Sequence, residues 1–488
     1  MKLEKTKSWR IKQKIGLVIL LLVFPIVLFV DNIDRIFPLR SEKVFPRSVE
    51  LKLSEEEMKI ASIAWKYFEN NYQPATGMVN AVQGYPSTTL WDTASYLGGL
   101  VAAHQLGIID THKFNTRLLK ITETFLYLKL VDDQVFNKAY NTQTMQMVNY
   151  ANQPGAIGYS AIDIGRLLIW FKIIKSLYPH FATNIDNIVL RLNFCLLIDK
   201  CGNLHGTVIG QTGKSIPTQE GRLGYEEYAA NGFALWGFST EAASMTEPYS
   251  DIPIYCVDIP YDARDSRTHG HNFVISESYI LNGLELGWQK VELGPNDNRL
   301  LVKDQWSYDT SAKIYEVQKR RYEHTGIVTA RSEHQLDKAP YFVYDTIYSD
   351  GFPWNTLTQD GKYSPASAAV ASKAALGLWS LYDNPYSKIL FDYTSELYDP
   401  EKGFYEGFYE NGMGPIKIFT ANNNGIILEA LLYRKIGPLL QGPLIPTRWE
   451  IMTSNDPQTF SYDGIKKCYP MSECPGLPKG PACGCKRN

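Results

Sequence analysis

The residues best suited to chemistry are acids that stand at the start of helix-like segments rich in Ala, Gly and Ser. The four acidic starts are Asp92, Asp163, the pair Glu226 and Glu227, and Glu277. An acid at a helix N-terminus often only caps the helix, which contributes about 0.3–1 kcal/mol. Four such acids facing one concavity would repel one another, and repulsion with burial raises the pKa of at least one carboxyl group. A protonated carboxylic acid beside an ionised carboxylate is the pair that glycoside hydrolysis requires.

Glu226 is the predicted general acid, and Asp92 is the predicted second carboxylate. Two like charges adjoin in the string GRLGYEEYAANGF, so one of these glutamates should titrate late. Neighbours on a helix differ by roughly 100° in direction, so Glu226 and Glu227 cannot both point into the cleft. The turn just before it favours Glu226, whereas Glu227 takes the role if the Ala230 face packs outward.

Aromatic residues near these acids are predicted to bind sugar rings. Trp91 and Tyr225 each directly precede one of the acids, where their rings could serve as stacking platforms. Asp350 and Trp354 belong to the loop SDGFPWNTLTQDG, and binding residues concentrate in such loops. The alternative is an ordinary Gly-Pro turn in which Trp354 plugs a surface groove.

Three further acids have weaker claims. Asp163 is a candidate for binding substrate, but Arg166 follows one turn later, and a structural ion pair between the two is the favoured interpretation. Glu406 and Glu410 lie in the aromatic string GFYEGFYENG, where they are equally compatible with a position facing solvent.

Other chemistries find less support in the sequence. His269 and His271 lack a matched third ligand, and no metal and no cofactor is predicted. Nucleophile-elbow, P-loop and dinucleotide-binding motifs are absent from the sequence. The main enzymatic rival is a polysaccharide lyase that uses Tyr261, Arg264, Arg267 and His269 around a uronate carboxylate. That reaction needs a cationic cleft, whereas the helix starts here are acidic.

The pattern of the whole chain predicts an all-α fold, an (α/α)6 toroid with short β-hairpin insertions. Inner helices are crowded on both sides and need small residues, while outer helices need only an apolar stripe. The expected inner segments begin at Trp91, Gly158, Gly224, Ser276, Ser364 and Thr420. The expected outer helices fall at 54–68, 114–128, 185–195, 239–245, 309–322 and 389–397. A solenoid of helix pairs needs a constant repeat, but the intervals here run from about 50 to 88 residues.

The N-terminus predicts export. An apolar run at residues 15–30 follows a basic flank, which indicates a single-pass anchor in a bacterial inner membrane with the body in the periplasm. A cleaved signal peptide is the alternative, but no small-x-small site follows the run. Lys and Arg total 49 against 51 Asp and Glu, so nucleic acid is not an expected partner.

The expected organisation has four parts. Residues 1–30 form the flank and anchor, 31–53 a linker, 54–441 the toroid, and 442–488 a tail rich in Pro and Cys. The tail cysteines are Cys468, Cys474, Cys483 and Cys485. An even number of cysteines in an oxidising compartment favours disulfides, with a zinc site as the alternative.

Several strings resemble a bacterial family known as domain of unknown function 3131. They are WDTASYLGGLVAAHQLGIID, FNKAYNT, GYSAIDIGRLLIW, SDGFPWNT and the helix start TANNN. The resemblance covers most of residues 54–440 and implies an (α/α)6 carbohydrate-active fold in the company of exopolysaccharide genes, but it implies no catalytic residues. The expected function is therefore a glycoside hydrolase or transglycosylase that acts on an exported polysaccharide, with polysaccharide synthesis or export proteins as possible partners. The alternative of another class is a non-catalytic glycan-binding scaffold of a polysaccharide export system.

Overall fold

The computed structural model describes residues 46–49, 52–199, 202–210, 214–220, 222–238, 240, 242–245, 248–263, 272–293, 299–445 and 448. The chain divides into two compact units, Met1–Phe45 and Pro46–Asn488, and all described residues belong to the second. The expected anchor at residues 15–30 and the four tail cysteines lie outside them. Within the described ranges, no helix is both long and apolar enough to cross a membrane.

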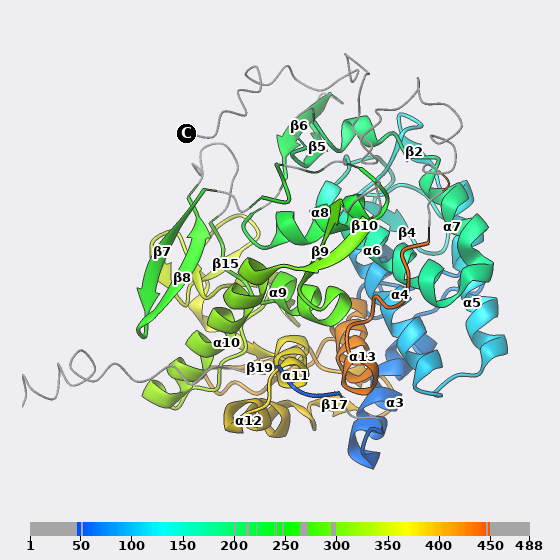
Figure 1. Cartoon of the computed structure of the whole chain (residues 1–488). Coiled ribbons are helices and arrows are strands. Elements are labelled where there is room, and N and C mark those ends of the chain that lie inside the picture. The colour runs from blue at the N-terminus through cyan, green and yellow to red at the C-terminus, as the bar shows by residue number, and fades with distance from the viewer. Residues whose placement is uncertain are drawn as a thin grey trace, which may run out of the picture. The chain divides into compact units, whose positions relative to one another are not determined.

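Six inner helices form a closed ring, which confirms the toroid predicted from the small-residue segments. In the order α4, α6, α8, α9, α11 and α13, each helix contacts the next, and α13 contacts α4 (Figure 1). Their bounds are α4 Leu90–Gln105, α6 Ala161–Leu177, α8 Tyr225–Leu235, α9 Glu277–Leu281, α11 Ser372–Leu381 and α13 Ala421–Ile436. Helix α9 continues as a π-helical turn, η4, over Asn282–Leu286.

Helices α6 and α8 cross in close contact. A Cβ atom at Gly232 would lie 2.0 Å from the carbonyl oxygen of Gly165, and one at Gly165 would lie 2.6 Å from that of Ala229. Both contacts are with backbone atoms, which cannot move aside as a flexible side chain can. Only glycine therefore permits this crossing distance.

Gly232→Ala is expected to lower the free energy of unfolding by roughly 1–3 kcal/mol, because the added methyl group overpacks the crossing. Helix propensity alone predicts the opposite, a gain of about 0.5–1 kcal/mol. Urea unfolding followed by circular dichroism measures the difference. A variant more stable than the wild type would contradict the close crossing.

Five outer helices surround the ring in the described part of the chain. They are α3 Glu55–Asn70, α5 Thr111–Tyr127, α7 Ala182–Val189, α10 Gln305–Thr325 and α12 Pro385–Thr394. Helix α3 opens with a capping box, in which the Ser54 hydroxyl accepts from the N–H of Glu57 at 3.2 Å and the Glu57 carboxylate accepts from the N–H of Ser54 at 2.7 Å.

The prediction of an outer helix at 239–245 is wrong. Residues 242–244 form a turn, and the hairpin β7 (Tyr249–Ile254) and β8 (Val257–Asp262) follows at the edge of the molecule (Figure 1). Ile259 of the hairpin shares a buried cluster with Tyr279 of α9 and Ile314 of α10. The hairpin therefore buries the apolar surface of α9 and α10 that an outer helix was expected to bury.

The remaining strands are short, and all pair antiparallel in the loops that connect the helices. The two-stranded pairs are β1 (Ser87–Thr89) with β4 (Ala139–Asn141), β2 (Leu130–Val131) with β3 (Val135–Phe136), β5 (His205–Ile209) with β6 (Ser215–Gln219), β9 (Gln289–Leu293) with β10 (Arg299–Lys303), β13 (Tyr348–Ser349) with β14 (Phe352–Pro353), and β17 (Tyr398–Asp399) with β18 (Gly403–Phe404). Two sheets have three strands, β11 (His334–Gln335), β12 (Phe342–Asp345) and β15 (Thr356–Thr358), and β16 (Ala369–Ala371), β19 (Gly407–Tyr409) and β20 (Pro415–Ile416).

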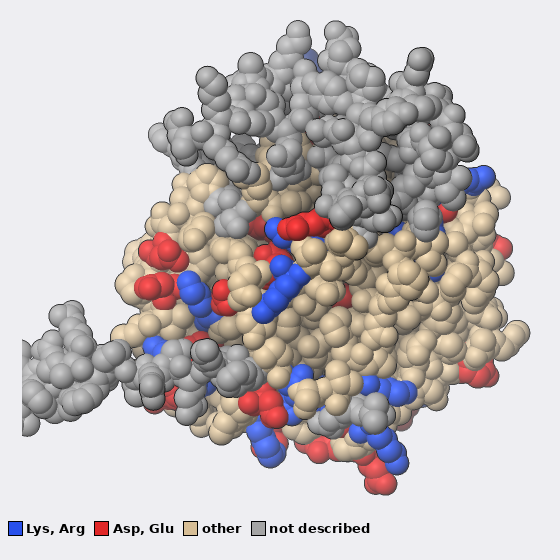
Figure 2. Space-filling view, in the orientation of Figure 1, with Lys and Arg blue, Asp and Glu red and all other residues tan. Residues whose placement is uncertain are grey.

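The visible face carries acidic and basic side chains interspersed with large uncharged areas (Figure 2). Among the described residues on that face, Lys and Arg form no continuous patch.

Candidate active site

A cavity of about 680 Å³ lies where the inner helices begin, within the range of roughly 300–1,000 Å³ typical of ligand pockets. The first turns of five inner helices contribute to its wall through Trp91 and Asp92, Ile162 and Asp163, Tyr225, Lys373, and Asn422. The toroid thus brings together residues from all round its ring.

Five carboxylates line the cavity, namely Asp92, Asp163, Glu220, Glu333 and Glu406. The basic side chains on the same wall are Lys138, Arg222 and Lys373. Aromatic rings complete much of the remaining surface, so the cavity combines acids with apolar platforms.

Asp92 is held by the N-terminal cap of α4. The Thr89 hydroxyl donates to Asp92 Oδ2 at 2.6 Å and accepts from the Asp92 N–H at 3.0 Å. Burial raises the pKa of Asp92, while Thr89 and Lys373 oppose the rise. The structure places this predicted residue on the cavity wall in a fixed orientation.

Asp163 occupies the equivalent position in α6. Its N–H donates to the hydroxyl of the N-cap residue Ser160 at 3.2 Å. Burial and the neighbouring Glu220 raise the pKa of Asp163 to about 7, and Lys138 opposes the rise. Glu220 forms an ion pair with Lys138 at 3.5 Å.

Glu333 stands just before strand β11 and is the second cavity acid that titrates near neutrality. Burial and the nearby Glu277 raise the pKa of Glu333 to about 7, whereas Arg222, Lys373 and Tyr225 oppose the rise. A carboxylic acid with a pKa close to the working pH is well suited to donate a proton.

Glu277, the first residue of α9, is buried next to the cavity wall. Its Oε1 accepts from Trp91 Nε1 and from Asn422 Nδ2, each at 2.9 Å, and its carboxylate pairs with Lys373. Burial disfavours ionisation, but the positive charge of Lys373 contributes most to holding the pKa of Glu277 below its ordinary value. Glu277 is therefore a buried negative charge that, after burial itself, contributes most to raising the pKa of Glu333.

Arg166 of α6 lies in the middle of the ring, behind Trp91. Its guanidinium carbon is 4.7 Å from the Trp91 ring centroid, Nη2 is 3.2 Å from Glu429 Oε1, and Nε is 3.6 Å from Glu285 Oε1. Arg166 thus pairs with these two buried acids instead of with Asp163, because its side chain points into the core while Asp163 faces the cavity.

The adjacent glutamates of α8 line no part of the cavity, so their predicted orientation has to be corrected. Glu226 is fully buried, and its Oε1 accepts from the N–H of Leu204 at 3.4 Å. Glu227 accepts from the N–H of Gly224, the N-cap residue of α8, at 2.7 Å. Helix α8 begins at Tyr225, and the Tyr225 side chain is the one that reaches the cavity.

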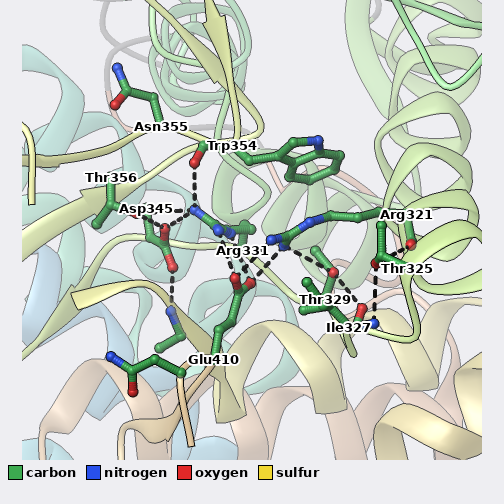
Figure 3. A network of polar contacts seen from close by, with 12 residues as sticks. Arg321, Thr325, Ile327, Thr329, Arg331, Asp345, Trp354, Asn355, Thr356 and Glu410 are labelled. Carbon is green, nitrogen blue, oxygen red and sulfur yellow. Dashed lines mark hydrogen bonds and ion pairs between the residues drawn. The ribbon is translucent and has the colours of Figure 1, made fainter. Parts of the chain in front are cut away.

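Asp350 and Trp354 also lie outside the cavity, so the structure does not bring them to its carboxylates. Asp350 is exposed in the turn between β13 and β14. The Trp354 ring covers Arg321 at 4.7 Å, and the Trp354 carbonyl accepts from Arg331 at 3.3 Å (Figure 3). Trp354 thus packs against the protein itself, and its binding of sugar stays a prediction.

Sequence reasoning missed Glu220 and Glu333 and ranked Glu406 too low. Glu406 is 2% exposed and accepts hydrogen bonds from the Thr420 hydroxyl and from the N–H of Gln335. Burial raises its pKa. The signal that could have found them is their position in the chain. All three lie in loops that lead from an outer element into an inner helix, and such loops form the cleft of a toroid.

No metal site is found in the described residues, and Tyr261 is the one residue of the lyase hypothesis that lies among them. No three His, Cys, Asp or Glu side chains in that part of the chain are arranged to hold a metal ion. Tyr261 packs on Tyr348 with ring centroids 4.6 Å apart and lies outside the cavity. The other residues of these two hypotheses lie outside the described ranges, and they are Arg264, Arg267, His269 and His271.

The (α/α)6 toroid of this chain is similar in fold to several solved carbohydrate-active proteins. A glucoamylase candidate from Bacteroides caccae matches with a TM-score of 0.57 at 12% identity, over 82% of this chain and 95% of that one. An endo-β-1,2-glucanase from Chitinophaga pinensis matches with a TM-score of 0.55 at 12% identity, over 80% of this chain and 94% of that one. An endo-β-1,2-glucanase from Talaromyces funiculosus matches with a TM-score of 0.53 at 11% identity, over 79% of this chain and 84% of that one. Identities this low show a shared fold alone.

The chain belongs to the family described as protein of unknown function, DUF3131, whose profile matches residues 59–437. This match confirms the family resemblance found in the sequence. A comparison with curated proteins finds no match.

Proposed function

We propose that this protein is a glycoside hydrolase that cleaves a β-linked glucan, with Glu333 as its general acid. The observation that carries the proposal is a cavity lined by aromatic rings and five carboxylates, two of which have a pKa raised to about 7. Similar folds support the substrate class, since one neighbour is an endo-β-1,2-glucanase in complex with sophorotriose and glucose, and another is a mutant endo-β-1,2-glucanase with β-1,2-glucan. β-1,2-Glucan is therefore the first substrate to test.

Glu333 donates its proton to the glycosidic oxygen as the bond from that oxygen to the anomeric carbon breaks. Asp92 acts as the second carboxylate, either by activating a water molecule or by attacking the anomeric carbon. Water supplies the hydroxyl group of the new reducing end. Its proton passes to Asp92 where water attacks directly, or back to Glu333 where water cleaves a glycosyl–Asp92 intermediate. Trp91 and Tyr225, which face the same space, offer apolar surface to the sugar rings.

Glu333 is preferred to Asp163 as the acid because the carboxylates that raise their pKa values differ in burial. The side chain of Glu277, beside Glu333, is 1% exposed. The side chain of Glu220, beside Asp163, is 14% exposed, so water screens its charge more. Asp163 is assigned to binding sugar hydroxyl groups.

A substrate screen tests the proposal. The full chain is incubated with β-1,2-glucan, other bacterial glucans and amino-sugar polymers, and new reducing ends are counted. Hydrolysis of a β-glucan supports the assignment. Measurable binding without product from any polymer would instead favour a glycan-binding scaffold.

We further propose that residues 15–30 anchor the protein in a bacterial inner membrane, with the body in the periplasm near an exported polysaccharide. The basic flank and the apolar run support this topology. Cell fractionation is expected to recover the intact chain with the inner membrane. A soluble mature protein that starts near residue 31 would contradict the anchor.

A further inference from the structure

Three of the tyrosines that line the cavity keep much of their surface exposed. The exposed fraction is 37% for Tyr85, 54% for Tyr150 and 64% for Tyr341. Trp91 and Tyr225 on the same wall are only 8% and 5% exposed. Exposed rings gathered at the mouth of a cavity are surface left for a ligand to cover.

These rim tyrosines stand on two separate groups of loops. Tyr85 lies in the segment before β1, and Tyr150 lies between β4 and α6. The Tyr85 hydroxyl donates to the carbonyl oxygen of Tyr150 at 3.1 Å, which ties these two loops together. Tyr341 lies in the turn between β11 and β12, in the same sheet that presents Phe342 and Tyr344 to the cavity.

Tyr341 is also held in an unfavourable backbone conformation. Its φ is 66°, in the left-handed region that a bulky residue rarely adopts. The Tyr341 N–H donates to the carbonyl oxygen of Lys338, and its carbonyl oxygen accepts from the N–H of Leu336, each at 2.9 Å. Strained residues of this kind cluster at ligand clamps, and here the strain presents a largely exposed ring at the cavity rim.

We propose that Tyr85, Tyr150 and Tyr341 form outer sugar-binding subsites, so that the protein binds a run of consecutive sugar units within one glucan chain. The face of a tyrosine ring packs on the C–H face of a pyranose, while its hydroxyl can bond to a sugar hydroxyl group. The inference rests on the proposed function and extends it from the cleaved bond to the neighbouring sugars. Affinity should therefore rise with chain length.

The test compares two variants of the full chain in binding experiments with sophorose and longer β-1,2-gluco-oligosaccharides. Tyr341→Ala removes a rim ring. Tyr363→Ala is the matched control, because Tyr363 is 67% exposed beside β15 of the same sheet but does not line the cavity. Both variants carry Glu333→Gln so that the ligand is not consumed during calorimetry.

In the Glu333→Gln background, affinity is expected to increase from sophorose to the longer oligosaccharides. Tyr341→Ala should weaken binding of the longer ligands by roughly tenfold and leave sophorose almost unchanged, while Tyr363→Ala has no effect. No dependence on length, equal losses in both variants, or no binding of either probe would overturn the inference. Length-dependent binding by a wild type that never hydrolyses the polymer would uphold the subsites and overturn the hydrolase.

Discussion

Glu333→Gln is expected to reduce hydrolysis by about 10²–10⁴-fold while leaving oligosaccharide binding nearly unchanged. Glutamine keeps the size and the hydrogen-bonding oxygen of the side chain but has no proton to give to the leaving sugar. Initial rates of reducing-end release, together with calorimetric binding of the same substrate, separate the two effects. A loss of binding as large as the loss of rate would contradict a role for Glu333 as the acid.

The matched control is Glu226→Gln, because Glu226 is a glutamate of an inner helix that is fully buried and does not line the cavity. This variant is expected to retain turnover. The reverse result, with Glu226→Gln inactive and Glu333→Gln active, would restore the assignment made from the sequence.

The pH profile gives a second test of the acid, although Asp163 shares a pKa of about 7 with Glu333. A general acid works in its protonated form, and the pKa of Glu333 is raised to about 7. The value of kcat/KM should therefore fall as the pH rises through about 7, since the protonated fraction is lost above the pKa. Activity that keeps rising into the alkaline range would exclude Glu333 as the acid.

Arg331→Met is expected to lower the free energy of unfolding by roughly 3–5 kcal/mol. Arg331 is 2% exposed, and it pairs with Asp345 and, at 2.8 Å, with Glu410 (Figure 3). Methionine replaces the aliphatic stem but leaves two buried carboxylates without this partner. Urea unfolding followed by circular dichroism measures the loss.

Lys388→Met serves as the control, because Lys388 forms an exposed ion pair with Asp392 one helical turn away. A pair of this kind contributes about 0.3–0.5 kcal/mol. We call Arg331, Asp345 and Glu410 the Arg331 cluster. Similar losses in the Lys388 and Arg331 variants would show that this cluster contributes no more to the free energy of unfolding than a surface ion pair does.

The Arg331 cluster also bears on the site, since Arg331 lies two residues before Glu333. The Arg331 N–H donates to Gln318 Oε1 at 2.7 Å, and the Gln335 N–H donates to Glu406 Oε2 at 3.2 Å. The segment that carries Glu333 is thus fixed on both sides. Loss of the cluster is expected to lower turnover as well as stability.

The ring of helices could be predicted because its packing leaves a mark on composition. Gly165 and Gly232 meet at a crossing that admits no Cβ atom, and such crossings explain why the inner segments are rich in small residues. The stretch at 239–245 carries no comparable constraint. Any helix or hairpin with one apolar face can pack against the inner helices at this position, and a hairpin does so.

The site could be predicted only in part. Asp92 and Asp163 were found because each is the third residue of an inner helix, where the cap fixes its direction. Glu226 was misplaced because successive residues of a helix point about 100° apart. If the start of α8 is predicted one residue too late, a different side chain is expected to face the cavity. Glu333 lies in a loop without periodicity, and only the assembled ring brings it beside Glu277.

A structure of the Glu333→Gln variant with a bound β-1,2-gluco-oligosaccharide tests the central claim most directly. We expect the sugar chain to cross the cavity, with a glycosidic oxygen within roughly 2.6–3.2 Å of the side chain at position 333 and Asp92 facing the anomeric carbon. A chain bound elsewhere, or one whose glycosidic oxygen lies against Asp163 instead, would contradict the assignment of Glu333 as the acid.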